Sequence, residues 1–420
     1  MSADVAAPPP LAIRRVRRML GRDPHEGGRA ATPLELLFDL AFVAAFGIAG
    51  NEMAHALAEG HVAVAIGGFA FGVFAITWAW INFSWFASAF DTDDWVYRLT
   101  TMVQMVGVVV LALGLSDVFH SLEEGHGVDN AVLVAGYVVM RVAMLAQWLR
   151  LAAQSPEHRL AALTYATAIA IAQVGWVALA VAHLELLPTI AVAGLLYVVE
   201  LGGPVVAERR TPTPWHAHHI AERYGLLAII ALGEGVLGTV AAVQPVIAEQ
   251  GWSTDAIVLV AAGVALTFGM WWAYFAIPFG DLLHRDRRGS FAFGYLHILV
   301  FAGIAAVGAG LHVGAYVVEG SASVGFSEAA RAVAIPVAVY LVALVGIADI
   351  LAGRVRPGHL ALLVAAIAAL VVAVLLSDTG SPFALDIALV AAAPWILVVG
   401  LEVLGRRQQE QPVLDRPHTA

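Results

Sequence analysis

The sequence predicts an all-α polytopic membrane protein with about twelve transmembrane helices. Its 420 residues are 60% hydrophobic and 13% charged, whereas about 25% of the residues of a typical soluble domain are charged. Twelve segments come close to or exceed the roughly 20 apolar residues that a helix needs to cross a bilayer. The expected spans are 33–51, 62–86, 96–117, 130–152, 160–182, 187–206, 217–243, 255–278, 290–317, 329–352, 359–376 and 383–404.

The charges of the loops agree with this count. All basic residues except Arg141, Arg223 and Arg331 fall on one side when the twelve spans are threaded through a membrane. The loops on the other side are acidic and hold only Arg331 among the bases. Arginine-rich loops stay in the cytoplasm, so both termini are expected to be cytoplasmic.

The first span begins with a helix cap and carries two acids. Thr32, Pro33 and Glu35 have the spacing of a capping box with proline at the first helical position, and this local role alone would explain Glu35. Asp39 lies one turn further on, about 6 Å deeper and on the same face. A charge inside hydrocarbon is costly and marks a functional candidate, so Asp39 is predicted to carry the coupling ion or proton.

Polar residues also interrupt spans three, four and six. Arg141 lies in the middle of span four, and Gln104 and Glu200 fall in the inner halves of spans three and six. We expect Gln104 and Glu200 to line a pathway. Arg141 is the predicted counter-ion of a buried acid, or the site for an anionic group of a substrate.

The seventh span repeats the acidic opening of the first. His219, Glu222 and Arg223 lie in its first turns and are expected to form a cytoplasmic gate network with Glu35; Arg223 has Glu35, Glu222 or Glu200 as its natural partner. Glu234 follows about 18 Å beyond Glu222, near the midplane. It is predicted to carry a proton or to pair with Arg141, because an isolated carboxylate there would neutralise.

The two openings indicate an internal repeat. His297 of span nine matches the depth of Gln104 and is a further candidate for the pathway. Six spans separate each matching pair, so the halves should be parallel and related by an axis along the membrane normal. The expected organisation is a basic N-terminal segment (1–32), a first six-helix repeat (33–206), a linker (207–216), a second repeat (217–404) and a mobile polar tail (405–420).

Other signals are local. The run His216-x-His218-His219-x-x-Glu222 has a helical spacing that could hold zinc, although interfacial histidines look the same in sequence. Residues 11–20 read as a basic interfacial helix that anchors the chain to anionic lipid. The chain has no cysteine, and we find no nucleotide-binding or nucleophile motif. No cofactor and no nucleic-acid partner are therefore expected.

Four motifs resemble the bacterial low temperature requirement A family. They are Thr-Pro-Leu-Glu-Leu-Leu-Phe-Asp-Leu-Ala-Phe-Val at 32–43, His-His-Ile-Ala-Glu-Arg-Tyr-Gly-Leu at 218–226, Ile-Ile-Ala-Leu-Gly-Glu at 229–234 and Tyr-Leu-His at 295–297. The resemblance covers spans one to ten well. It implies a multi-pass protein of a bacterial cell membrane that is linked to growth in the cold and has no established substrate.

These observations favour a proton- or cation-coupled secondary transporter of an unidentified ion or small molecule. One alternative is an ion channel whose pore is lined by spans one and seven. Another is a metal-dependent membrane enzyme that uses His216, His219 and Glu222. The lipid bilayer is the expected environment, and the sequence leaves assembly into a homo-oligomer open.

Overall fold

The computed structural model describes residues 16–125 and 127–414, and within these ranges the regular elements are all helical. Twelve helices are long and apolar enough to cross a membrane, as the sequence predicts. The α-helices are α1 (Pro33–Ala58), α2 (Val62–Phe90), α3 (Trp95–Leu113), α4 (Leu115–Glu124), α5 (Ala131–Gln154), α6 (Arg159–Ala182), α7 (Leu186–Arg210), α8 (Ala217–Ala231), α9 (Gly233–Gln250), α10 (Thr254–Phe275), α11 (Phe279–Arg285), α12 (Ser290–Val318), α13 (Phe326–Leu351), α14 (Pro357–Ser377) and α15 (Phe383–Leu414).

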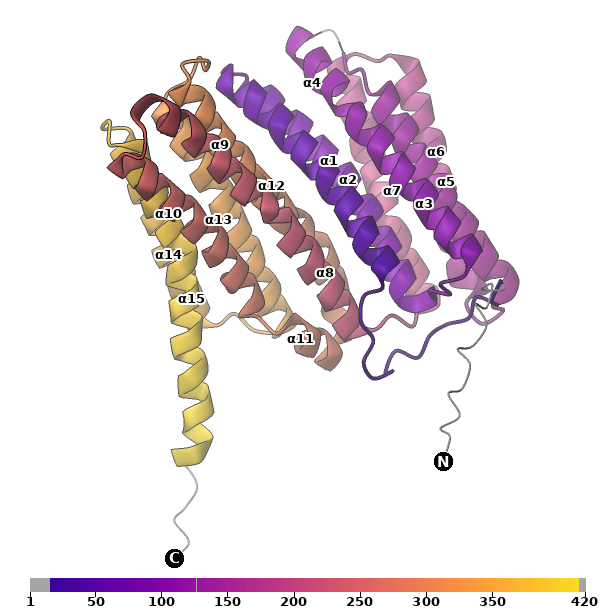
Figure 1. Cartoon of the computed structure of the whole chain (residues 1–420). Helices are drawn as coiled ribbons and strands as arrows, with labels where there is room; N and C mark the ends of the chain where they lie inside the picture. The colour runs from indigo at the N-terminus through magenta and orange to yellow at the C-terminus, as the bar shows by residue number, and fades with distance from the viewer. Residues whose placement is uncertain (1–15, 126, 415–420) are drawn as a thin grey trace, which may run out of the picture.

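The helices form two bundles that lie side by side. Helices α1 to α7 make one bundle and α8 to α15 the other, as Figure 1 shows. At the boundary, α1 and α2 pack against α8 and α12. The first and seventh spans therefore meet between the halves. Their superposition by a rotation about the membrane normal stays a prediction.

The third and seventh spans are each interrupted by a change from one helix to the next. The third changes from α3 to α4 at Gly114, and the seventh changes from α8 to α9 at Leu232. A Cβ atom on Gly114 would lie 2.3 Å from the backbone nitrogen of Leu133, so a small residue is required for the chains to approach this closely. The break in span seven puts Glu234 in the first turn of α9.

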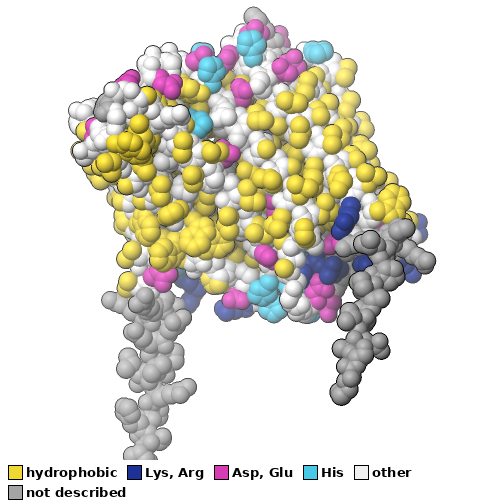
Figure 2. Space-filling model, in the orientation of Figure 1, with side chains coloured by type: hydrophobic (Ala, Val, Ile, Leu, Met, Phe, Trp, Pro, Cys, Tyr) yellow, Lys and Arg dark blue, Asp and Glu magenta, His cyan; other side chains and the backbone are white. Residues whose placement is uncertain are grey.

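The surface agrees with a membrane environment. Figure 2 shows hydrophobic side chains over the middle of the visible face, acids and histidines along the upper end, and arginines near the lower end. Helix α1 begins and α15 ends at that lower end (Figure 1). The arginine-rich loops thus share the end of the molecule to which the sequence assigns both termini.

The N-terminal segment differs from its prediction. Residues 11–15 of the expected interfacial helix lie outside the described residues, and residues 16–20 are not helical. Instead this stretch lies against the first bundle. Arg17 donates its backbone N–H to Asp94 (3.0 Å), and the fully buried Met19 donates its own to the Gln154 side chain (2.7 Å). The sequence pattern could not reveal these partners, because they lie 77 and 135 residues further along the chain.

Helices also extend into the predicted linker (207–216) and the predicted tail (405–420). Helix α7 continues to Arg210, so only residues 211–216 connect the two bundles. Helix α15 runs on to Leu414 and takes in most of the segment expected to be a mobile tail. Arginine, glutamine and glutamate, which make up residues 406–410, are good helix formers, so the helix can extend beyond the apolar zone.

Candidate functional site

A buried ionic cluster joins the two bundles. Arg223 of α8 donates from Nη1 to Glu35 (2.8 Å) and from Nη2 to Asp39 (2.6 Å), both on α1. Trp80 of α2 donates its indole N–H to the same Asp39 oxygen at 2.7 Å, and His219 Nε2 lies 3.4 Å from Glu35. We call these five residues the boundary cluster. Their charged side chains are at most 1% exposed.

Glu35 has two roles at once. Its Oε2 accepts the backbone N–H of Thr32 at 2.8 Å, and Thr32 Oγ1 accepts the N–H of Glu35, so the predicted capping box is present. The other oxygen, Oε1, is the one that meets Arg223. Helix capping therefore orients the carboxylate toward the second bundle, and the cap alone does not account for this residue.

The boundary cluster has more acid than base. It holds two carboxylates, Glu35 and Asp39, and one arginine. His219 is the remaining titratable member, and neither of its ring nitrogens makes a hydrogen bond of good geometry among the described residues. A net negative charge in a water-poor site is costly. The cluster is thus suited to hold one exchangeable proton, shared among these groups.

An acid outside the membrane spans lies close to this cluster. Asp91 follows α2, and burial raises its pKa to about 6, with the negative charge of Glu35 raising it further while Arg29 and Arg22 oppose the shift. Arg22 Nη1 lies 3.7 Å from the Asp91 carboxylate. Asp91 can therefore take up a proton near neutral pH at the arginine-rich end, next to the boundary cluster.

A second ionic cluster lies within the first bundle. Glu200 of α7 accepts from Arg141 Nη2 (2.7 Å), from the Trp78 indole (2.9 Å), from the Tyr137 hydroxyl (2.9 Å) and from the Gln173 amide (3.3 Å). We call this the Glu200 cluster. One carboxylate meets one guanidinium here, so the charges balance. Arg141 still has Nε and Nη1 buried without a hydrogen-bond partner among the described residues.

The predicted pairing of Arg141 with Glu234 is therefore wrong. The two residues match in depth, but α5 packs against α2, α3 and α6 inside the first bundle. Glu234 is partly buried on the other side of the boundary and faces Gly47 of α1, where an added Cβ would lie 2.7 Å from its Oε1. It makes no ion pair or hydrogen bond with any residue that the structure describes. Depth alone could not identify the neighbouring helix.

Three other predicted residues lie apart from the boundary cluster. Glu222 is exposed, because it is about 100° around the helix from Arg223, and it does not join the predicted gate network. His297 contacts the Tyr274 hydroxyl (3.0 Å) and the carbonyl of Phe293 (2.7 Å), so it packs within the second bundle. Gln104 is buried, and its amide nitrogen lacks a partner within the described chain.

The histidine motif does not converge. His216 caps α8 by accepting the N–H of His219, His218 is exposed, and His219 points to Glu35. Among the described residues, one group of three possible metal ligands has its ligand atoms close enough together to hold an ion: Glu59, His61 and Glu123. That group is exposed and lies at the ends of α1, α2 and α4, away from the arginine-rich end.

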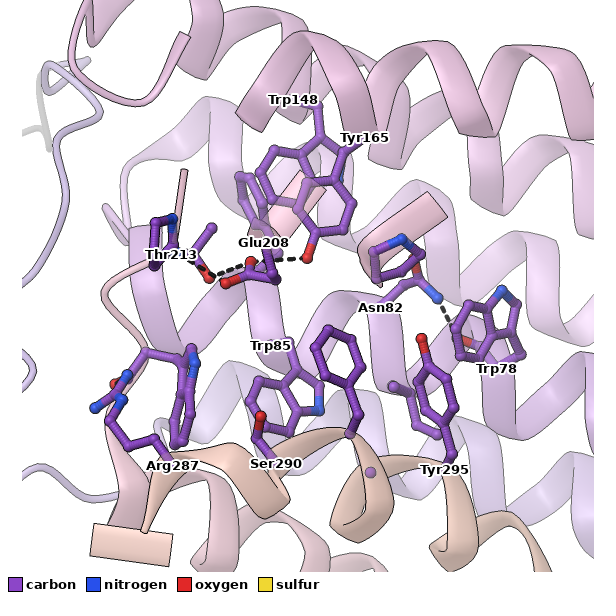
Figure 3. Close-up of a pocket in the computed structure, with 17 residues that line it drawn as sticks. Trp78, Asn82, Trp85, Trp148, Tyr165, Glu208, Thr213, Arg287, Ser290 and Tyr295 are labelled. Atoms are coloured by element: carbon purple, nitrogen blue, oxygen red, sulfur yellow. Dashed lines mark hydrogen bonds between the residues drawn. The ribbon is translucent and has the colours of Figure 1, made fainter. Parts of the chain in front are cut away.

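A cavity of about 210 Å³ lies between the bundles at the arginine-rich end. Eight aromatic side chains line it, together with Glu208 and Arg287 (Figure 3). The aromatic residues are Trp78, Trp85, Phe86, Trp148, Tyr165, Trp215, Phe291 and Tyr295. They come from α2, α5, α6, the 211–216 connection and α12, so both halves and their linker form the pocket.

Tryptophans of α2 connect this aromatic pocket to both ionic clusters. Trp78 lines the pocket and donates to Glu200. Trp85 also lines it and donates to the Tyr224 hydroxyl of α8 at 2.9 Å. The Tyr224 ring packs edge-on against Trp80, 4.8 Å away, and Trp80 holds Asp39. A change in the pocket can therefore reach Glu200 through one contact and Asp39 through three.

The aromatic members of these sites are absent from the predicted site residues. A buried indole N–H usually needs a partner, and Trp78 and Trp85 are seven residues apart on one helical face. That pattern was the available signal. Glu208 was missed because it lies in the segment assigned to the linker.

Comparison with known proteins gives one family match and one relative of moderate identity. The family model described as "Bacterial low temperature requirement A protein (LtrA)" matches residues 30–394. An uncharacterized protein of Rhizobium meliloti (strain 1021) is 25% identical over 287 residues, which are 64% of this chain and 66% of that protein; the match thus spans just under two thirds of the relative's length. No solved structure matches. The family match covers most of the chain, so this protein belongs to the bacterial low temperature requirement A family.

Proposed function

We propose that the protein is a secondary transporter driven by protons or cations, with the boundary cluster as its coupling site. The observation that carries this proposal is a buried cluster with one acid too many, placed across the contact between the two bundles. In parallel-repeat transporters, substrate and coupling sites lie between the repeats. Intramembrane acids of this kind are typical of proton relays.

The coupling step follows from the charges. A proton that reaches Asp39 or Glu35 removes one of the two negative charges that hold Arg223. The contact of α1 with α8 then loses one of its two ion pairs, while the remaining carboxylate still balances Arg223. The cluster changes from a net negative charge to a neutral one, and a difference in proton affinity between two conformations of the bundles would shift the balance between them. Release of the proton to the other side restores the pair.

The aromatic pocket provides the other half of the mechanism. Its wall residue Trp78 is hydrogen-bonded to Glu200, and Trp85 is hydrogen-bonded to Tyr224, whose ring packs against Trp80 of the boundary cluster. A ligand that displaces these tryptophans alters the surroundings of Glu200 and Asp39. Substrate binding and proton binding would thereby act on one equilibrium, which is what coupling requires.

The ion pairs between α1 and α8 favour this function over a channel pore along the same helices. A pore there would have to run through the contact that Arg223 closes with two hydrogen-bonded carboxylates. The divergence of His216, His219 and Glu222 gives the metal-dependent enzyme no support.

An untargeted transport assay tests the proposal. Proteoliposomes are incubated with a bacterial metabolite extract under an inward proton gradient, and the retained compounds are measured by mass spectrometry. At least one compound should accumulate, a protonophore should abolish the accumulation, and Asp39→Asn should abolish it too. Glu222→Gln, an exposed neighbour on α8, serves as the control and should retain uptake. Unitary currents in planar bilayers, or no accumulation of any compound, would overturn the transporter.

A further inference from the structure

The aromatic pocket contains an acid and a base that do not pair with each other. Glu208 has no cation within ion-pair distance among the described residues, and Arg287 has no carboxylate within it. Both side chains line the same cavity. Opposite charges that line one aromatic pocket would ordinarily be expected to form an ion pair, so their separation needs a structural cause.

Each charged group is held in place by a neighbour from the 211–216 connection. Glu208 Oε1 accepts from the Thr213 hydroxyl (2.7 Å) and the Tyr165 hydroxyl (2.9 Å), and its Oε2 accepts the backbone N–H of Thr213 (3.0 Å). The Arg287 guanidinium lies 3.7 Å from the centre of the Trp215 ring and donates from Nη2 to the Trp215 carbonyl. Stacking and hydrogen bonding thus fix the two charges apart.

Both groups keep capacity for a ligand. An ionised carboxylate has about four acceptor positions, and Glu208 uses three of them, which leaves Oε2 free to accept once more. A guanidinium has about five N–H donors, and Arg287 uses one in the hydrogen bonds of the described chain. The site therefore offers one further acceptor and several donors at fixed positions.

The pocket is polarised along its length. In Figure 3, Glu208 and Arg287 lie toward the side of Thr213, whereas Trp78 and Tyr295 lie toward the opposite side. The volume of about 210 Å³ is below the roughly 300–1,000 Å³ of pockets for drug-sized ligands. The ligand should be small, with its charges at one end and an apolar body at the other.

We propose that this pocket binds a small zwitterion with an apolar or aromatic body, of the α-amino acid type. The ammonium group would donate to Glu208 Oε2, the carboxylate would accept from Arg287, and the side chain would lie among Trp78, Trp85 and Tyr295. A simple cation would be attracted by Glu208 but repelled by Arg287. A simple anion would be attracted by Arg287 but repelled by Glu208. Only a molecule with both charges satisfies both groups. As the transported substrate, this molecule rests on the transporter proposed above; as a bound ligand, it does not.

Three probes with one body isolate the charges. Phenylalanine has both, phenethylamine keeps only the ammonium group, and 3-phenylpropionate keeps only the carboxylate; leucine extends the set to an aliphatic body. Binding is measured by calorimetry and thermal shift on the purified full-length protein. Phenylalanine or leucine should bind at least about tenfold more tightly than either singly charged probe, because a singly charged probe makes one charge-assisted hydrogen bond fewer.

Two substitutions assign the contacts. Glu208→Gln should weaken the binding of phenylalanine and phenethylamine by about tenfold or more. It should not weaken the binding of 3-phenylpropionate, whose carboxylate then loses only the repulsion by Glu208. Arg287→Gln should show the mirror pattern. The control is Arg288→Gln, because Arg288 is an arginine next in sequence whose side chain is 95% exposed. A singly charged probe that binds as well as the zwitterions, or no binding by any probe at millimolar concentration, would overturn the proposal.

The same assays separate this inference from the proposed function. If zwitterions bind but never accumulate in proteoliposomes under a proton gradient, the transporter fails and the binding site stands. If another class of compound accumulates while zwitterions do not bind, the transporter stands and this pocket assignment fails. The two proposals can therefore fail independently.

Discussion

Arg223 determines how the boundary cluster responds to change. It is fully buried and directs its donors at Glu35 and Asp39, while the Trp80 ring lies 5.6 Å from the guanidinium carbon. Removing the cation leaves two buried carboxylates without a counter-charge. Removing one acid leaves Arg223 paired with the remaining acid. These two changes are therefore not equivalent.

Arg223→Met should destabilise the protein by roughly 3–5 kcal/mol, because it leaves buried charge uncompensated. Adding Asp39→Asn and Glu35→Gln removes that charge and should recover much of the loss. The stability of the single variant and of the triple variant is measured by thermal unfolding in the same detergent. Glu222→Gln should remain within about 0.5 kcal/mol of the parent, as an exposed substitution does. A triple variant no more stable than Arg223→Met would contradict this account.

Glu200 and Glu234 should respond differently to the same substitution. Glu200→Gln leaves the buried Arg141 without its carboxylate, so stability should fall by roughly 3–5 kcal/mol. Glu234→Gln removes a charge that has no partner in the described structure, so folding should be preserved. If both glutamines destabilise equally in thermal unfolding, the assignment of Arg141 to Glu200 is wrong.

Asp91 predicts a pH dependence of stability. Its pKa is raised by burial from 3.8 to about 6, so the folded state holds the proton more tightly than the unfolded state. The resulting stabilisation is complete below about pH 4 and is lost as pH rises to about 6. Melting temperatures measured across this range should fall more for the parent than for Asp91→Asn. Parallel curves would show that Asp91 does not titrate there.

At the scale of helices, close contact between α3 and α5 positions the Glu200 cluster. A Cβ on Gly136 would lie 2.2 Å from the backbone nitrogen of Leu111, and one on Gly107 would lie 2.8 Å from the carbonyl of Gly136. Tyr137 and Arg141 follow on α5, so their distance from Glu200 depends on this approach. Small residues at such contacts let membrane helices pack tightly.

Gly136→Ala should therefore push α3 and α5 apart and destabilise the fold by at least about 1–3 kcal/mol, the usual effect of overpacking. Gly194→Ala on α7 is the matched control, because an added Cβ there meets nothing within 4 Å. Thermal unfolding compares the two. Equal stability of both variants would mean that the contact relaxes without consequence.

The membrane spans could be predicted from the sequence, because a helix that crosses the hydrocarbon layer needs about 20 apolar residues. The sequence also located Glu35, Asp39 and Arg223, since charge in that layer is rare. It could not pair Arg141 correctly, because depth along the membrane normal does not determine which helix is the neighbour. The aromatic pocket could not be assembled from the sequence for the same reason, because its aromatic residues alone come from five separate segments.

At the scale of the whole molecule, the two bundles share one end for their arginine-rich loops. Helix α1 begins and α15 ends there (Figure 1), and the aromatic pocket lies at the same end. If positive charge keeps these loops in the cytoplasm, then the pocket is reached from the cytoplasm in this conformation. Orientation therefore decides from which side a zwitterion would first bind.

A topology measurement tests this orientation. A reporter fused after Ala420 should be active only in its cytoplasmic form, because arginine-rich segments resist translocation. A second fusion at His183, between α6 and α7 at the opposite end, should be active only in its periplasmic form. As a control, each site is also fused to the reporter that is active only on the other side of the membrane, and these fusions should be inactive. If the two signals are exchanged, the molecule is inverted, and the pocket between the bundles opens to the periplasm. If both fusions report the same side, an even number of crossings separates them, and the count of twelve crossings is wrong.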